Sequence, residues 1–356
     1  MRPYVILSDL HFHPWSQFAE MNGAGVNSRL AGLVGEVQRA AQAVKDAGGD
    51  TMFLAGDIFH TRGSIEPVVL NLVMDCFRKL TSEGITIRAI PGNHDLATKD
   101  TTRLHNAAAA LEDCGVEMVH TGSGEEFFVG SDAIVRMIPW HEDLATLRMH
   151  IEDWTPERRR ITDLIIHAPI DGVIKGIPDH GLDPAWLASL GYRNVFAGHY
   201  HHHKQAAPNV YSIGALAHHT WSDVGTKAGF LLVDKEVRWM KSHLPAFIDV
   251  DKNEDLSDEE LAMIVDQNYA RAKVSGASLK EIETLREFLL ESGAKGVIIQ
   301  SVKEPTTTRE TKVVKSGESL SDSVNSYIGK SITLDPEMIA LVTKECREIL
   351  IDAEAI

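Results

Sequence analysis

Short apolar runs in this sequence repeatedly end in a polar block that contains histidine, aspartate or asparagine. The blocks are Asp9-Leu10-His11, Gly56-Asp57, Gly92-Asn93-His94-Asp95, His167 and Gly198-His199-Tyr200-His201. The runs that precede them have the length and composition of buried strands. In open α/β folds, ligands bind beyond the carboxyl ends of the strands, so we expect these blocks to meet at one edge of the protein.

The apolar spacing between the blocks predicts alternating strands and helices. Strands are predicted over 4–7, 51–55 and 85–90, with helices over 27–47 and 64–80. This order implies a parallel sheet with right-handed crossovers. Later short runs predict a helical segment over 142–153 and strands over 127–129, 133–138, 161–166, 195–197, 210–213, 229–233 and 237–241. We expect a second sheet of antiparallel strands. The predicted fold class is an α/β sandwich of two sheets flanked by helices.

The sequence changes character near residue 245, because residues 251–356 contain no histidine and none of the polar blocks. We predict three parts: a catalytic domain over 1–245, a smaller α+β capping domain over 246–332, and a C-terminal helix over 333–356. The elements expected after residue 245 are strands over 247–250 and 296–302 and helices over 258–272, 279–291, 319–327 and 335–352. The last helix is amphipathic, so it either packs on its own domain or docks on a partner.

The net charge of −16, from 35 basic and 51 acidic residues, argues against a general basic surface for nucleic acid. No apolar run is long enough for a membrane span, and we expect no membrane association. The N-terminus becomes polar too soon for a signal peptide and is expected to form the first strand. Three widely spaced cysteines suggest neither a disulfide framework nor a thiolate zinc site, so the expected compartment is the cytoplasm.

The residues at the predicted strand ends form a donor set suited to two metal ions. The set contains two carboxylates, one carboxamide and four imidazoles: Asp9, His11, Asp57, Asn93, His167, His199 and His201. These donors are too many for one tetrahedral ion, and Asp57 is the natural bridge between two. Nitrogen and oxygen donors without thiolate suit manganese, iron or zinc rather than calcium. Two ions about 3.5 to 4 Å apart can hold a hydroxide and clamp a phosphate, so phosphoester hydrolysis is expected.

His94 follows the expected ligand Asn93 and need not bind metal itself. It can instead face the scissile phosphate and protonate the leaving oxygen or stabilise its charge. Two roles are open for Asp95: it orients His94, or it accepts a hydrogen bond that caps the loop.

In order and spacing, the five blocks resemble those of the calcineurin-like metallophosphoesterases. More narrowly, Ala55-Gly56-Asp57-Ile58-Phe59-His60 resembles the SbcD-type DNA-repair nucleases, bacterial or bacteriophage. Tyr211-Ser212 with Gly214, and Lys227-Ala228-Gly229-Phe230, are similar to the segment after the histidine block in that group. One departure is His218-His219, where the group tends to carry an arginine.

The narrower resemblance implies that His60 assists an exonuclease reaction. It also implies a homodimeric nuclease subunit that hydrolyses DNA phosphodiesters, by exonuclease or endonuclease cleavage, together with an SbcC-type coiled-coil ATPase. Its setting would be DNA end processing, repair or recombination. Two divalent ions are implied, and we expect Mn²⁺. The alternative is a stand-alone metallophosphoesterase acting on nucleotides, cyclic nucleotides or phosphoproteins.

Several other residues have predicted environments. His202 and His203 are expected to be exposed, whereas His218 and His219 either line the substrate cleft or belong to a turn. Partial burial is the expected state of Trp15 and Trp140, with base stacking as the alternative. The loop over 306–318 carries Arg309, Lys312 and Lys315, which are a candidate DNA contact or simply solvated.

Overall fold

A computed structural model describes residues 1–98, 103–131, 133–251, 256–302 and 338–346 of the chain. Two compact units are separated at residue 301: Met1–Ser301 and Val302–Ile356. In the second unit, residues 338–346 are helical, which confirms that part of the helix expected over 335–352. The basic loop over 306–318 and the helix expected over 319–327 lie outside the described residues. Among the described helices, none combines the length and apolarity that a membrane crossing requires.

The first sheet has six strands in the order β12-β11-β1-β2-β3-β4. Their bounds are Tyr4–Leu7 (β1), Thr51–Ala55 (β2), Thr86–Ile90 (β3), Val116–Met118 (β4), Gly229–Val233 (β11) and Val237–Lys241 (β12). Strands β1, β2 and β3 are parallel, as predicted, and β4 extends the parallel part of the sheet. Strands β11 and β12 add an antiparallel edge. The helices α1 (Ser28–Asp46) and α2 (Pro67–Ser82) connect β1 to β2 and β2 to β3.

The second sheet also has six strands, in the order β5-β6-β7-β8-β10-β9. Their bounds are Glu125–Val129 (β5), Ala133–Ile138 (β6), Thr162–His167 (β7), Asn194–Gly198 (β8), Lys204–Ala207 (β9) and Val210–Ser212 (β10). Strands β6, β7, β8 and β10 are parallel, and β5 and β9 are antiparallel edges. The prediction of a wholly antiparallel second sheet is therefore wrong. The short runs that form β11 and β12 joined the first sheet instead, because apolar alternation specifies a strand but not its partner.

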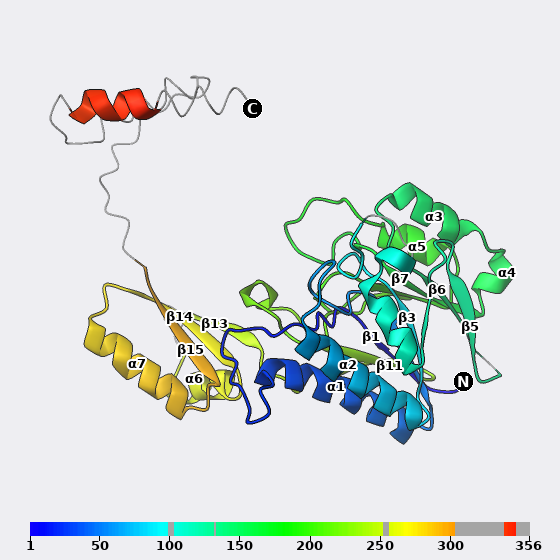
Figure 1. Cartoon of the computed structure of the whole chain (residues 1–356), viewed down its shortest axis with the longest axis horizontal. Helices are drawn as coiled ribbons and strands as arrows, with labels where there is room; N and C mark the ends of the chain where they lie inside the picture. The colour runs from blue at the N-terminus through cyan, green and yellow to red at the C-terminus, as the bar shows by residue number, and fades with distance from the viewer. Residues whose placement is uncertain (99–102, 132, 252–255, 303–337, 347–356) are drawn as a thin grey trace. The chain divides into compact units, whose positions relative to one another are not determined.

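The helices cover the outer faces of the two sheets (Figure 1). Alternate residues of β1 point to opposite sides, as strand geometry requires. Val5 and Leu7 pack in a core shared with α1 and α2, whereas Tyr4 and Ile6 pack in the core between the sheets. The second sheet has its own outer core with α3 (Leu144–Glu152) and α5 (Pro184–Ser189). The remaining short elements are η1 (Arg103–His105), η2 (Ala107–Cys114), α4 (Pro156–Arg159) and η3 (Trp221–Asp223).

A separate three-stranded sheet in the order β13-β14-β15 follows the sandwich. Its strands are Phe247–Asp251 (β13), Tyr269–Ser275 (β14) and Gly296–Val302 (β15), with helices α6 (Asp258–Val265) and α7 (Leu279–Glu291). These elements enclose a small core of their own. The domain boundaries at residues 245 and 332 stay a prediction.

The helix predicted over 258–272 is wrong in its second half. Helix α6 ends at Val265, and Gln267 has a positive φ of 60° that a continuing helix does not allow. The chain then forms β14, which pairs in parallel with β13. The apolar residues Ala270, Ala272 and Val274 are buried at every second position, which is the period of a strand. The prediction missed this strand because it extended the helical spacing of the preceding residues through 272.

A buried polar network links the two sheets of the sandwich. Asp163, fully buried in β7, accepts hydrogen bonds from the Tyr4 hydroxyl in β1 and from the Asn194 side chain. The Arg193 guanidinium forms an ion pair with the same carboxylate. The network thus fixes the start of β1 against the starts of β7 and β8, and so aligns the two sheets.

Removing this carboxylate is expected to destabilise the protein far more than removing one of its donors. Asp163→Ala leaves a partly buried guanidinium unpaired and should lower the unfolding free energy by about 3 to 5 kcal/mol. Tyr4→Phe removes one hydrogen bond and should cost about 1 kcal/mol. Urea unfolding followed by circular dichroism measures both changes.

The exposed pair between Asp75 and Arg78 provides a matched control. Asp75→Ala should change the unfolding free energy by less than about 0.5 kcal/mol. Equal effects of Asp163→Ala and Asp75→Ala would contradict a structural role for the buried network.

Candidate metal centre

The predicted strand-end residues meet at one edge of the sandwich. Asp9 and His11 follow β1, Asp57 follows β2, and Asn93 follows β3 in the first sheet. His167 ends β7, and His199 and His201 follow β8 in the second sheet. Three groups of residues place donor atoms close enough to share an ion: Asp9 with His11 and His201, Asp57 with His167 and His199, and His11 with His60 and His94.

Asp57 lies between imidazoles from both sheets. Its Oδ2 is 3.6 Å from Nε2 of His11 and 3.5 Å from Nε2 of His167. Its Oδ1 accepts the backbone N–H of His94 at 2.8 Å. The carboxylate therefore lies close to imidazoles that come from both sheets.

The other donors crowd one another in the same way. Asn93 Oδ1 lies 3.2 Å from His167 Nε2 and 3.1 Å from His199 Nδ1. Nε2 of His11 and Nε2 of His201 face each other at 3.2 Å. Such convergence of ring nitrogens and side-chain oxygens is the arrangement that a shared cation requires.

Burial also fits a cationic occupant. Asp9 and Asp57 are only 0% and 2% exposed, and within the described part of the chain neither forms an ion pair with lysine or arginine. A buried carboxylate is costly unless a positive charge or several donors compensate it. In addition, the His11 Nδ1 atom is buried without a hydrogen-bond partner. We conclude that the residues present fit divalent metal ions.

The backbone at this edge is strained. Positive φ angles occur at Asp9 (50°), His11 (43°), Asp57 (52°) and His199 (105°). Residues other than glycine rarely adopt this region, and such strain concentrates at functional sites. Gly92 serves a related purpose, because a Cβ atom there would lie 2.2 Å from Asp57 Oδ1. The strand-end loops can therefore approach one another only with glycine at this position.

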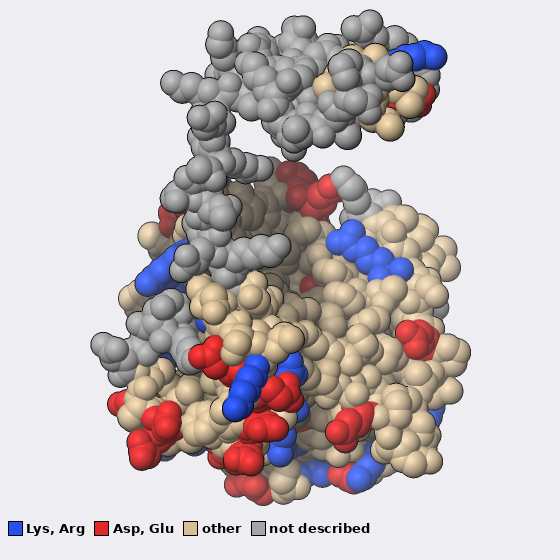
Figure 2. All heavy atoms as spheres, turned by 90° about the vertical axis from the view of Figure 1, so that its left-hand side faces the viewer, with Lys and Arg blue, Asp and Glu red and all other residues tan. Residues whose placement is uncertain are grey.

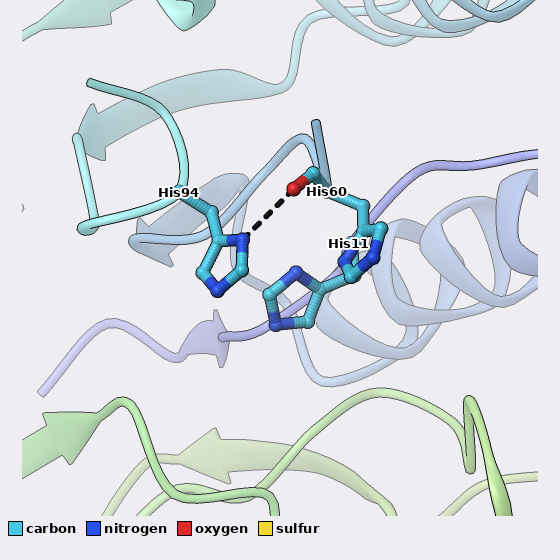
Figure 3. Close-up of side chains that lie close together, drawn as sticks. All are labelled: His11, His60 and His94. Carbon is cyan, nitrogen blue, oxygen red and sulfur yellow. Dashed lines mark hydrogen bonds between the residues drawn. The ribbon is translucent and has the colours of Figure 1, made fainter. Parts of the chain in front are cut away.

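His60 and His94 lie together beside His11 (Figure 3). The rings of His60 and His94 are stacked with centroids 5.4 Å apart, and His94 is also 4.8 Å from the His11 ring. Nδ1 of His94 hydrogen-bonds to the backbone oxygen of His60 at 2.8 Å, which fixes the ring and assigns the proton to Nδ1. Nε2 of His94 is thereby left for another contact.

Asp95 caps the loop and does not orient His94. Its carboxylate accepts backbone N–H groups from Ile58, Phe59 and Gly92 at 2.9 to 3.1 Å. These bonds join the loop after β2 to the loop after β3. Of the two open roles, the capping role is therefore the observed one.

The pKa values in the metal-free site follow from burial and mutual charge. Burial opposes the imidazolium of His167, but the charge and hydrogen bond of Asp57 raise its pKa to about 9. Burial alone would raise the pKa of Asp57, yet the charge of His167 holds it well below its usual range. Burial lowers the pKa of His199 to about 3, and lowers that of His60 to about 4 with help from His13 and His94.

Sequence reasoning missed Asp223, which supports a predicted ligand. Its Oδ1 lies 2.7 Å from His201 Nδ1, so it fixes the ring with Nε2 toward the centre. Its other oxygen accepts the backbone N–H groups of His219 and Thr220. Asp223 ends the short helix η3, which does not directly follow a strand-like run, so no pattern in the sequence pointed to it.

His219 belongs to the same support and is buried. Its Nε2 donates to the backbone oxygen of Asp9 at 3.0 Å, and its ring packs 5.2 Å from His11. His218 is also buried, and its Nδ1 accepts the backbone N–H of Phe247. Both residues also line a cavity of about 390 Å³ with Trp15 and Arg29, so the cleft and the turn alternatives both stay open.

The two tryptophans pack against site residues and are partly buried, as expected. Trp15 contacts the His60 ring at 4.5 Å, and Trp140 stacks on His199 at 5.2 Å. The expected exposure of His202 and His203 is wrong, since both are half-buried. His203 stacks on Trp239 at 5.6 Å, a contact with β12 that local sequence does not reveal.

The sequence model of the calcineurin-like phosphoesterase family matches residues 2–203, more than half of the chain. The chain belongs to the calcineurin-like phosphoesterases. This family uses divalent metal ions, and the donor clusters described above could bind them. The chain thus has a donor set that fits the divalent ions used by its family.

A curated relative of this phosphoesterase is exonuclease subunit 1 of Enterobacteria phage T4, which is 28% identical over 204 residues. The match covers 56% of this chain and 57% of the relative, so the chain spans little more than half of that protein's length. Among solved structures, the protein TT1561 of Thermus thermophilus has a TM-score of 0.40 at 12% identity, covering 67% of this chain and 98% of its own. A dimetal phosphatase from Danio rerio has a TM-score of 0.40 at 10% identity, covering 65% and 91%. Neither structural likeness carries an argument about the substrate.

Metal binding is expected to release a proton near neutral pH. Because the pKa of His167 is about 9 without metal, its imidazole is protonated at pH 7 and must lose that proton to bind a cation. Affinity for Mn²⁺ should therefore rise as the pH increases from about 6.5 to about 9. Calorimetric titration in buffers of different ionisation enthalpy measures the released protons.

His167→Asn supplies the comparison, because an amide has no proton to lose. The variant should release about one proton fewer per binding event at pH 7. The difference should fall to about half a proton at pH 9 and vanish above about pH 10, where the histidine is neutral. Equal proton release by the two proteins at pH 7 would contradict the assignment.

Proposed function

We propose that this phosphoesterase is a DNA nuclease that hydrolyses phosphodiester bonds by exonuclease or endonuclease cleavage. The observation that carries the proposal is the pair of histidines, His60 and His94, stacked beside the Asp57 donor cluster. The cluster accounts for metal-dependent phosphoester hydrolysis, and the pair adds imidazoles next to the reacting position. The name of the T4 relative, exonuclease subunit 1, supports a nuclease in preference to other phosphoesterases.

The proposed metal ligands come from both sheets, with Asp57 between them. They are Asp9, His11, Asp57, Asn93, His167, His199 and His201. When bound, two divalent ions would polarise the phosphate and supply a nucleophile at neutral pH. The protein itself holds the donor rings in place through Asp223 on His201 and through the loop cap at Asp95.

The two proposed catalytic histidines have different tasks. His94, held by its Nδ1 bond to His60, directs Nε2 to the substrate and protonates the leaving oxygen or stabilises its charge. His60 has a pKa of about 4, lowered chiefly by burial, so it is neutral at pH 7 and does not act as an acid. Its ring stacks on His94, so its proposed task is to position that histidine in the exonuclease reaction.

The partner and setting follow from the same proposal. The word subunit in the name of the T4 relative supports a partner protein, for which we propose a coiled-coil ATPase of the SbcC type. We further propose Mn²⁺ as the activating ion, a homodimer, and a role in DNA end processing, repair or recombination. The mixed nitrogen and oxygen donors suit manganese.

The test is hydrolysis of linear double-stranded DNA and of a bis-aryl phosphodiester, with Mn²⁺, Mg²⁺ or chelator. Asp57→Ala should lose both activities, because the bridging carboxylate is gone. His60→Ser should keep its metal and the small-ester activity, while DNA cleavage falls about 100-fold, as for loss of one positioned catalytic group.

His243→Ser is the matched control, since His243 is exposed and lies outside the cluster. It should cleave DNA at the unsubstituted rate. If the protein cleaves the small ester but leaves DNA intact, even with a candidate ATPase present, the stand-alone phosphoesterase replaces the nuclease proposal.

A further inference from the structure

A groove of about 880 Å³ opens directly beside two of the proposed metal ligands, His199 and His201. Its lining includes Lys175, Lys204 and Lys227, which come from three separate segments of the chain. The volume is far larger than one phosphate group needs. A substrate that places one phosphate at the ligands therefore has room to extend along the groove.

The charge of this groove is opposite to that of the whole chain. The protein has a formal charge of −16, and acidic side chains gather over the lower part of the face seen in Figure 2, with no broad basic area among its described residues. Among the described residues that line the groove, by contrast, Asp223 is the only carboxylate. That carboxylate is 2% exposed and already bonded to His201 and to backbone N–H groups. The lysines thus face the groove without a competing free anion.

None of the three lysines is neutralised by a carboxylate within the described residues. Lys204 donates to the backbone oxygen of Gly172 at 2.6 Å, which positions its ammonium without removing its charge. Lys227 is exposed and lies 5.7 Å from the centre of the Trp239 ring. Lys175 is exposed. Three uncompensated positive charges beside a phosphoesterase centre favour further phosphates of the same substrate.

The basic lining also continues beyond the groove. Lys227 lines a second cavity of about 300 Å³, together with Trp239 and Lys241. The two cavities share the loop residues Gly225 and Thr226. A chain of phosphates can extend along both cavities, whereas a single nucleotide would occupy only the part of the groove next to the metal ligands.

We infer that this lysine groove binds the backbone of the DNA strand that is cut, on one side of the scissile phosphate. The inference rests on the proposed nuclease function and deepens it. Each lysine contacts a phosphate and positions the strand without reading its sequence, so the groove contributes affinity for a polyanion and no base preference.

The test compares two triple variants of the full-length protein loaded with Mn²⁺. In the first, Lys175→Ala, Lys204→Ala and Lys227→Ala remove the groove charges. In the second, Lys235→Ala, Lys273→Ala and Lys280→Ala remove three exposed lysines outside both cavities, with the same change in net charge. Bound manganese and thermal melting verify that each variant is folded and loaded. The measured quantities are KM and kcat for a single-stranded oligonucleotide at about 50 to 200 mM salt.

The groove variant should have a KM for DNA about tenfold higher than that of the unsubstituted protein. Its KM should also depend less on salt: for three lost phosphate contacts, the slope of log KM against log salt concentration should be smaller by about 2. The control variant should match the unsubstituted protein. Equal KM and slope in the two variants would overturn the inference, as would a loss confined to kcat. Failure of the unsubstituted protein to cleave both this oligonucleotide and linear double-stranded DNA contradicts the proposed function itself, and the groove assignment with it.

Discussion

The structure depends on one buried charge, the carboxylate of Asp57. It is almost fully enclosed, and its neighbours are histidines from both sheets rather than lysine or arginine. Such a group is stable only where positive charge is concentrated around it. The same requirement supports the proposal that it bridges two cations. In the metal-free protein, the attraction between Asp57 and His167 holds the site together. Bound metal ions would replace the positive charge of His167 beside Asp57.

The rest of the fold positions this charge. Parallel strands from two sheets deliver their final residues to one edge, and the Asp163 network aligns the sheets at the opposite ends of β7 and β8. Positive φ angles at four of the donor residues store strain that the packed sheets support. Asp95 then joins the two loops that carry Asp57 and Asn93. This rigidity keeps the donor atoms close together although their charges and lone pairs repel one another.

The sequence predicts strand ends well and partners poorly. The runs before Asp9, Asp57 and Asn93 identified the parallel strands, because buried strands leave a strong local signal. The placement of β11 and β12, the strand β14 and the support by Asp223 depend on contacts between distant segments, which local patterns do not contain. Asp95 shows the same limit. Its position next to His94 suggested that it orients that ring, but its carboxylate accepts backbone N–H groups that include Phe59 in the loop after β2.

The central claim is that the donors around Asp57 hold two divalent ions at once. Crystals soaked in Mn²⁺, with anomalous diffraction measured near the manganese edge, test it most directly. Two anomalous peaks about 3.5 to 4 Å apart on either side of Asp57 are expected. One peak bound only by His11, His60 and His94, or no peak within reach of Asp57, would contradict the account.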